Sequence, residues 1–120
     1  MKRRRIILSN ILKNNKITLF QKKVYRTVLD IPSGQVRSYS WVAARIGVPG
    51  SARAVGNALN RNPYPVSVPC HRVVKSDGKI GGYYKGRRVK EELLRREGVD
   101  CVCGRVIIFK KQRELYDRGV

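Results

Sequence analysis

The stretch between residues 62 and 74 constrains the fold most strongly, because it contains three of the five prolines in the chain. Each proline ring fixes its own φ and favours extended backbone in the residue before it, so we expect a stiff backbone here. The only histidine, His71, follows directly after Cys70 in this stretch. A histidine exchanges protons near neutral pH and a thiol can become a nucleophile. The stretch is therefore the first candidate for a reactive site.

The composition predicts one compact domain with a polyanionic partner. The chain has 120 residues, of which 42% are apolar, enough for a single core. Its 27 basic and 8 acidic residues give a net charge of +19. A compact domain with this charge repels itself, which favours nucleic acid as the partner over a merely solvated basic surface. Binding to an acidic membrane would require an amphipathic helix with bulky apolar residues opposite the basic ones, and no long stretch fits.

The three cysteines point to a reducing compartment. An odd number argues against a disulfide framework, and no signal peptide or transmembrane span is evident. We expect a cytoplasmic protein, associated with the nucleoid in a prokaryote or nuclear in a eukaryote. Cys101 and Cys103 have no nearby histidine, which makes a metal site unfavourable, and we expect neither a metal nor another cofactor.

Apolar periodicity predicts a first helix at residues 19–30, with Thr18 as its N-cap. Pro32 and Gly34 then predict a turn over residues 31–34. A short helix that Ser38 or Ser40 caps should end at Gly47, and a second should follow at residues 52–60. The Gly-x-Pro-Gly link between these two helices is typical of a helix-turn-helix.

The second half of the chain predicts strands and one further helix. We expect short strands at residues 66–68 and 73–74, a turn at 77–78, a wing-like loop at 80–84, a helix at 87–97 and a strand at 101–109. In the helix we expect Val89, Leu93 and Leu94 to face inward and Lys90, Arg95 and Arg96 to face water. The predicted fold is mainly α with short strands, a single winged helix-turn-helix-like domain at residues 18–109. A basic arm at 1–17, either strand or helix, precedes it, and a basic tail at 110–120 follows.

The helix at residues 52–60 contains an unusual number of small side chains: Ala52, Ala54, Gly56 and Ala58. Such a narrow helix can approach another backbone closely. The alternative is that these residues only pack against a neighbouring helix.

The chemistry of Cys70 depends on its surroundings. The many positive charges should favour the thiolate, so we expect Cys70 to ionise more easily than a free thiol. Adjacent side chains on a strand point to opposite faces, so contact with His71 requires an irregular backbone or a bridging water. Glu97 lies in the last turn of a helix, where a carboxylate is unfavourable, which suggests a tertiary partner such as His71. A Cys-His hydrolase, a thiol that accepts a group, and a structural cysteine in a DNA-binding domain all remain open.

The chain resembles the O6-alkylguanine-DNA alkyltransferase family, specifically its C-terminal DNA-binding and active-site domain. The resemblance is carried by the hexapeptide Pro69-Cys70-His71-Arg72-Val73-Val74 and extends from about Phe20 to Gly98. It also includes the segments Ile31-Pro32-Ser33-Gly34-Gln35-Val36, Ser38-Tyr39, Ala52-Arg53-Ala54-Val55-Gly56, Asn62-Pro63, Gly81-Gly82-Tyr83, and Lys90-Glu91 through Glu97-Gly98.

The resemblance implies direct repair of DNA in a single turnover. Such a protein binds the minor groove of double-stranded DNA as a monomer, flips out an O6-alkylguanine and transfers the alkyl group irreversibly to a cysteine. O4-alkylthymine is a further candidate substrate. The alternatives are a non-catalytic sensor of alkylated DNA, in which the acceptor cysteine is usually replaced by tryptophan, and a plain winged-helix DNA-binding module.

The resemblance also implies residue roles. Cys70 would accept the alkyl group, His71 would take its proton through a water, Glu97 would orient His71, Asn62 would brace the turn, and Tyr39 would donate to the guanine ring. Arg53 would replace the flipped base in the duplex, and the same helix would contact DNA through Ser51, Ala52, Ala54, Gly56 and Asn57. Val73, Tyr83 and Tyr84 would line the base pocket.

The chain departs from the family pattern at several places. Trp41 lies where a polar residue is common, and Lys85, Arg87 and Arg88 make their loop more basic than usual. Only the basic arm precedes Thr18, where typical members carry an α/β domain, sometimes with a structural zinc. Tyr84 occupies a position where a small serine is common, which should change the width of the pocket.

Overall fold

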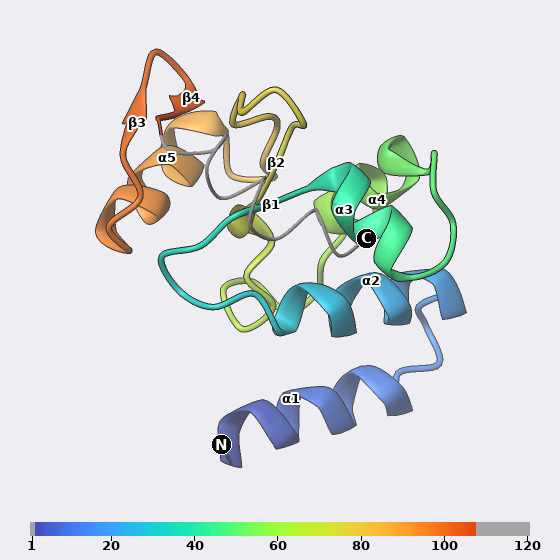
Figure 1. Cartoon of the computed structure of the whole chain (residues 1–120). Helices are drawn as coiled ribbons and strands as arrows, with labels where there is room; N and C mark the ends of the chain where they lie inside the picture. Colours follow the sequence, from blue (N-terminus) through green and yellow to red (C-terminus); the bar gives the residue numbers. More distant parts are fainter. Residues whose placement is uncertain (1, 108–120) are drawn as a thin grey trace.

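The computed structural model describes residues 2–107, which form five helices and four short strands (Figure 1). The helices are α1 (Lys2–Lys13), α2 (Leu19–Leu29), α3 (Tyr39–Arg45), α4 (Ala52–Asn60) and α5 (Arg87–Arg96). The strands are β1 (Arg37–Ser38), β2 (Val73–Val74), β3 (Cys101–Val102) and β4 (Arg105–Val106), with a 3-10 helix at Cys70–Arg72 before β2. This mainly helical fold with short strands is the fold class that the sequence predicts.

Helix α2 begins with a complete capping box. The Thr18 hydroxyl accepts a hydrogen bond from the Gln21 amide (3.0 Å), and the Gln21 side chain accepts one from the Thr18 amide (2.8 Å). The turn after α2 lies one residue later than predicted, because the Gln35 amide donates to the Pro32 carbonyl. This register places Gly34, with φ of 86°, at the third position, where a type II turn requires positive φ.

Helices α3 and α4 pack on α2 and complete the larger core cluster. Ser38 caps α3 through its hydroxyl, which accepts from the Trp41 amide at 2.9 Å, and Gly47 follows the helix with φ of 85°. Ser51 occupies the N-cap position of α4, but its side chain makes no capping hydrogen bond. The buried side chains of this cluster include Val24, Val28, Val42, Val55 and Leu59.

The predicted strand at residues 66–68 is wrong. Val66 has φ of 68°, an uncommon value for a β-branched residue, and the segment folds as tight turns. The Val68 amide donates to the Tyr64 carbonyl (2.9 Å) and the Ser67 amide to the Pro65 carbonyl (2.7 Å). Extended backbone begins only at β2, which pairs in parallel with β1.

The last part of the described chain forms a hairpin where the sequence predicts one strand. Strands β3 and β4 pair antiparallel around Cys103 and Gly104, both with positive φ, while residues 108 and 109 lie outside the described residues. Backbone hydrogen bonds from Ile80 to Gly104 (2.8 Å) and from Val106 to Gly78 (2.9 Å) tie this hairpin to the wing loop. A second, smaller core cluster lies here; it contains Val36, Val74, Ile80, Leu94, Val99, Cys101 and Val106.

The basic arm, which the sequence left open between strand and helix, is helical. Helix α1 packs on α2, and its Ile11 is fully buried in the larger cluster (Figure 1). The Lys22 ammonium donates to the Leu12 carbonyl at 3.1 Å. The basic tail at 110–120 lies outside the described residues. Between residues 2 and 107, no helix combines the length and the apolar character needed to cross a bilayer.

We predict that Ile11→Ala lowers the free energy of unfolding by about 2–5 kcal/mol, because it leaves a cavity between α1 and α2. The matched control is Ile6→Ala on the same helix, where the side chain is 60% exposed and the loss should stay within about 0.5 kcal/mol. Urea unfolding followed by circular dichroism measures both. Equal small losses would show that α1 does not contribute to the core.

Candidate active site

A cavity of about 410 Å³ opens between α3, α4 and the loop that follows β2. Seven of the residues singled out from the sequence line it: Tyr39, Ala52, Arg53, Gly56, Asn57, Cys70 and Tyr83. The tertiary structure thus brings the candidate nucleophile together with the helix of small residues. Cys70 itself is only 4% exposed, so its sulfur is reached from this cavity rather than from open surface.

Cys70 is the first residue of the 3-10 helix, so the backbone at Cys70 and His71 is not a regular strand. An irregular backbone is what a contact between the thiol and the imidazole of adjacent residues requires. Asn62 supports the preceding turn from the side. Its amide nitrogen donates to the carbonyls of Val68 (3.0 Å) and Tyr64 (3.3 Å), and its amide oxygen accepts from the Tyr64 amide (2.9 Å). The Cys70 amide also donates to the Val68 carbonyl (2.8 Å), so the position of the sulfur is set by this turn.

The expectation that Cys70 ionises easily is wrong. Burial raises the pKa of the Cys70 thiol above its ordinary value, although a hydrogen bond from Asn62 and the charge of Lys90 act in the opposite direction. Most of the positive charge lies on the surface, where water screens it. The thiol is therefore protonated at rest and needs a base.

His71 and Glu97 form the pair that the sequence suggested. The His71 Nε2 atom lies 3.1 Å from the Glu97 Oε2 atom. Arg72 holds the same carboxylate through its Nε (2.9 Å to Oε1) and Nη2 (2.6 Å to Oε2). The Arg72 Nη1 atom also donates to the Ile31 carbonyl at 2.7 Å. The unfavourable helix-end position of Glu97 is thus compensated by donors from the 3-10 helix.

The protonation states in this cluster follow from its contacts. Partial burial alone would raise the pKa of Glu97, but hydrogen bonds from Arg72 and His71 outweigh it and hold the pKa below its ordinary value. Burial lowers the pKa of His71, although Glu97 opposes this. An ionised carboxylate only accepts hydrogen bonds, so the proton of the neutral ring is on Nε2. The buried Nδ1 atom has no hydrogen-bond partner among the described residues and can accept a proton.

Lys90 belongs to a segment that carries the family resemblance, but no role in the site was predicted for it. It was expected to face water, yet it is fully buried, and its Nζ atom donates to the Tyr39 hydroxyl (3.2 Å) and the Gly82 carbonyl (3.1 Å). Its position four residues before Leu94 was the available signal, because these two positions share one face of α5. Burial lowers the pKa of Lys90 to about 7 and raises the pKa of Tyr39 to about 12.

The remaining predicted residues lie at the edge of the cavity or away from it. Arg53 and Asn57 are exposed on α4 and line the cavity, while Ser51 and Ala54 lie on α4 or at its start but outside the lining. Val73 is fully buried in the larger core cluster and does not line the cavity. Tyr84 is 40% exposed and does not line the cavity; its ring packs against Tyr83, with a centroid distance of 4.8 Å.

Comparison with known families gives a match over most of the chain. The family described as 6-O-methylguanine DNA methyltransferase, DNA binding domain, matches residues 19–99. A methylated-DNA–protein-cysteine methyltransferase from Methanothermobacter thermautotrophicus is 50% identical over 82 residues, which are 68% of this chain and 46% of the relative. One from Methanosarcina barkeri is 50% identical over 80 residues, 67% of this chain and 51% of the relative. The chain spans about half the length of these curated relatives.

Comparison with solved structures also finds proteins with a similar fold. The fold is similar to Mycobacterium tuberculosis OGT in complex with DNA, with a TM-score of 0.67 and 48% identity over 68% of this chain and 50% of that one. It is also similar to S. pombe Atl1 in complex with damaged DNA containing O6-carboxymethylguanine, with a TM-score of 0.62 and 36% identity over 68% of this chain and 77% of that one.

We predict that Lys90 makes stability depend on pH above neutrality. Its folded pKa of about 7 lies below its ordinary value of 10.5, so between these values the unfolded chain holds more protons and stability rises with pH. The rise is at most about 1.4 kcal/mol per pH unit for one group. Lys90→Met should remove it, whereas Lys79→Met, at an exposed position, should retain it. Urea unfolding at pH 7, 8, 9 and 10 measures this; parallel curves for wild type and Lys90→Met would contradict it.

Proposed function

Because this chain belongs to the 6-O-methylguanine DNA methyltransferase family, we propose that it repairs O6-alkylguanine in double-stranded DNA by transferring the alkyl group to Cys70. The observation that carries the proposal is the position of the Cys70 thiol. The thiol lines a cavity beside α4, and the next residue in the chain, His71, is hydrogen-bonded to Glu97. The cavity volume of about 410 Å³ lies within the range of about 300–1,000 Å³ typical of small-molecule sites, which suits a flipped base.

The transfer is one displacement. The Cys70 sulfur attacks the alkyl carbon, the new C–S bond forms as the C–O6 bond breaks, and the electron pair of that bond remains on the guanine. The thiol proton passes to the His71 Nδ1 atom, directly or through one water. The guanine anion takes up one proton from water and His71 gives its extra proton back to water, so that the thiol loses one proton and the guanine gains one. The thioether is stable, so each molecule reacts once.

His71 is suited to be the base because it is neutral at pH 7 and its free nitrogen is Nδ1. As Nδ1 accepts the thiol proton, the ring becomes a cation beside the ionised Glu97 carboxylate. This contact stabilises the thiolate–imidazolium state, which burial of Cys70 alone disfavours.

Tyr39 is suited to stabilise the departing guanine. Its raised pKa keeps the hydroxyl protonated, so it is a donor. Because Lys90 already donates to the Tyr39 oxygen, the hydroxyl proton is free to point into the cavity, toward a ring nitrogen of the bound base. A hydrogen bond aimed at developing negative charge strengthens in the transition state.

Helix α4 is suited to the minor groove. Its small side chains allow close approach to the floor of the groove, and Arg53 is exposed at the rim of the cavity. The guanidinium can fill the space that the flipped base leaves. This contact offsets part of the unstacking cost of a few kcal/mol.

We predict that a duplex with one O6-methylguanine adds one methyl group to the wild-type chain, located on Cys70 by peptide mass spectrometry. Cys101 and Cys103 serve as internal controls and should stay unmodified. Cys70→Ser should bind the same duplex without gaining mass. Binding by the wild-type chain without any mass gain would instead assign the role of a damage sensor, and equal affinity for damaged and undamaged DNA would leave a plain DNA-binding module.

We predict that Glu97→Gln slows transfer by about 10–100-fold, because it removes the carboxylate that orients His71 and stabilises its cation, part of the roughly 10²–10⁴-fold effect of a positioned base. DNA affinity should not change, since Glu97 does not line the cavity. The matched control is Glu92→Gln on α5, where the carboxylate pairs only with Arg96 in an exposed i,i+4 contact. Single-turnover kinetics measure both variants. Equal rates for the two would remove Glu97 from the mechanism.

A further inference from the structure

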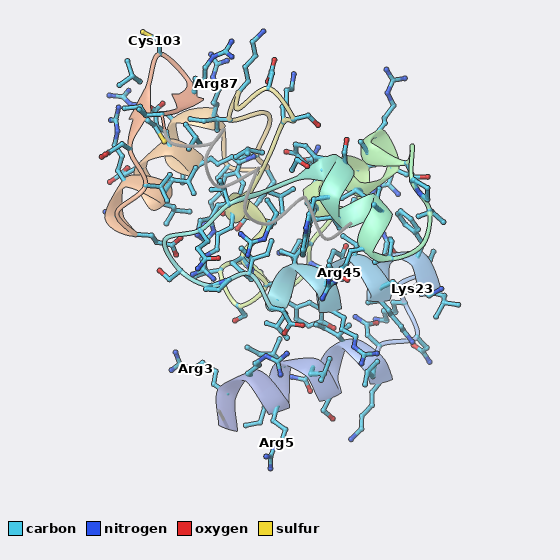
Figure 2. All side chains as sticks on the ribbon, viewed as in Figure 1. Arg3, Arg5, Lys23, Arg45, Arg87 and Cys103 are labelled. Carbon is cyan, nitrogen blue, oxygen red and sulfur yellow. The ribbon has the colours of Figure 1, made fainter. Side chains whose placement is uncertain are left out.

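A second cavity, of about 700 Å³, lies on the far side of the wing loop from the active site, between that loop and the β3–β4 hairpin. Four cationic side chains line it: Lys75, Lys79, Arg87 and Arg105. We call this set the basic groove. Figure 2 shows Arg87 at the end of the molecule that carries the hairpin, where Cys103, another lining residue, is also labelled.

The positive charge of the basic groove is poorly compensated by the residues that the structure describes. Between residues 2 and 107, the only carboxylate that lines it is Glu91, which already pairs with Arg95 at 2.8 Å. Lys79 lies 3.9 Å from the Asp77 carboxylate, but both side chains are more than half exposed, so the attraction is weak. Among the described residues, the Lys75 and Arg87 side chains have neither a hydrogen bond nor an ion pair. Four cations gathered in one hollow repel one another, and a bound polyanion would relieve that repulsion.

The groove is held by backbone contacts rather than by flexible side chains alone. Lys79 and Arg105 form a β-bridge, and the Arg105 Nη1 atom donates to the Asp77 carbonyl at 2.9 Å. Glycines form part of the lining; a Cβ at Gly82 or Gly104 would meet nothing within 4 Å, so the floor is open to a bulky ligand. Cations carried on a backbone that is held in this way, above an open floor, suit a chain of phosphates.

The basic groove adjoins the active-site cavity. Lys75 and Gly82 line both cavities, so the two hollows lie on either side of these residues, and a duplex bound at the active site is long enough to reach the groove. We propose that the basic groove binds the phosphate backbone of the same DNA duplex, beyond the segment that contacts α4. This proposal rests on the proposed function in one respect only, that duplex DNA is the ligand of the protein.

The first test compares two double variants that remove the same charge from opposite ends of the molecule. Lys79→Gln/Arg87→Gln removes two cations of the groove, and Arg3→Gln/Arg5→Gln removes two exposed cations of α1 (Figure 2). Affinity for an unmodified duplex is measured by fluorescence anisotropy at several salt concentrations. Each phosphate contact contributes about 0.9 to the slope of log affinity against log salt. The magnitude of this slope should fall by about 2 in the groove variant. It should fall by clearly less in the α1 variant.

The outcomes separate this proposal from the proposed function. An unchanged slope in the groove variant, or equal losses in both variants, would overturn the groove as a phosphate site. A loss on single-stranded DNA with none on the duplex would assign it to a single strand and overturn the proposal as stated. Because the duplex is undamaged and no transfer occurs, these results hold whether or not Cys70 accepts an alkyl group.

Cys103 provides a second, independent measurement, because it is exposed and lines the basic groove. The experiment uses a set of duplexes, and each duplex carries one disulfide-activated thiol tether. The tether is attached to a different phosphate in each duplex, one position further along the strand each time. If the backbone lies in the groove, mixed-disulfide formation at Cys103 should peak at one tether position and be suppressed in Lys79→Gln/Arg87→Gln. Equal rates at every position, or rates no higher than with a small disulfide of the same tether, would contradict a bound backbone.

Discussion

The hydrogen-bonded cluster of Glu97 with His71 and Arg72 is the interaction on which both the site and its surroundings depend. It joins the end of α5 to the 3-10 helix, and Arg72 extends it to the Ile31 carbonyl after α2. A carboxylate at the C-terminal end of a helix is unfavourable by itself, so these donors make the position stable. Because the imidazole and the guanidinium share one carboxylate, the same contact fixes the ring of His71 and the backbone that begins at Cys70.

Burial sets the resting state of the site. It raises the pKa of the thiol and lowers the pKa of the imidazole, so Cys70 and His71 are both neutral before a substrate binds. A thiolate is the form that oxidants and electrophiles attack, so a protonated thiol is protected from them. In the proposed reaction the charged pair forms only when an alkyl group is in place. In that proposed reaction, the cost of burial therefore favours alkyl transfer to Cys70 over reaction of its thiol with oxidants in solution.

The short parallel pair of β1 and β2 divides the interior and places the site between the two halves. Adjacent residues of a strand point to opposite faces, so Val73 belongs to the larger cluster and Val74 to the smaller one. The pairing of Arg37 with Val73 also brings the start of α3, and with it Tyr39, close to the 3-10 helix. Most of the described cations remain on the surface around this divided core. Arg37 and Lys90 are buried, and the Lys90 ammonium contacts the Tyr39 hydroxyl.

The sequence by itself determined the features that depend on neighbouring residues. The cap at Thr18, the helix stop at Gly47, the helix at residues 52–60 and the ordered motifs around Cys70 are all local patterns, and the family follows from the motifs. Only the tertiary structure decided the turn at Val66, the burial of Lys90 and the protonation of Cys70. The turn depends on the three-dimensional position of the Asn62 side chain, which donates to the Val68 carbonyl, and desolvation by packed segments sets both pKa values. Every element that excludes water from a group contributes to its desolvation. A short sequence pattern therefore cannot predict the resulting pKa.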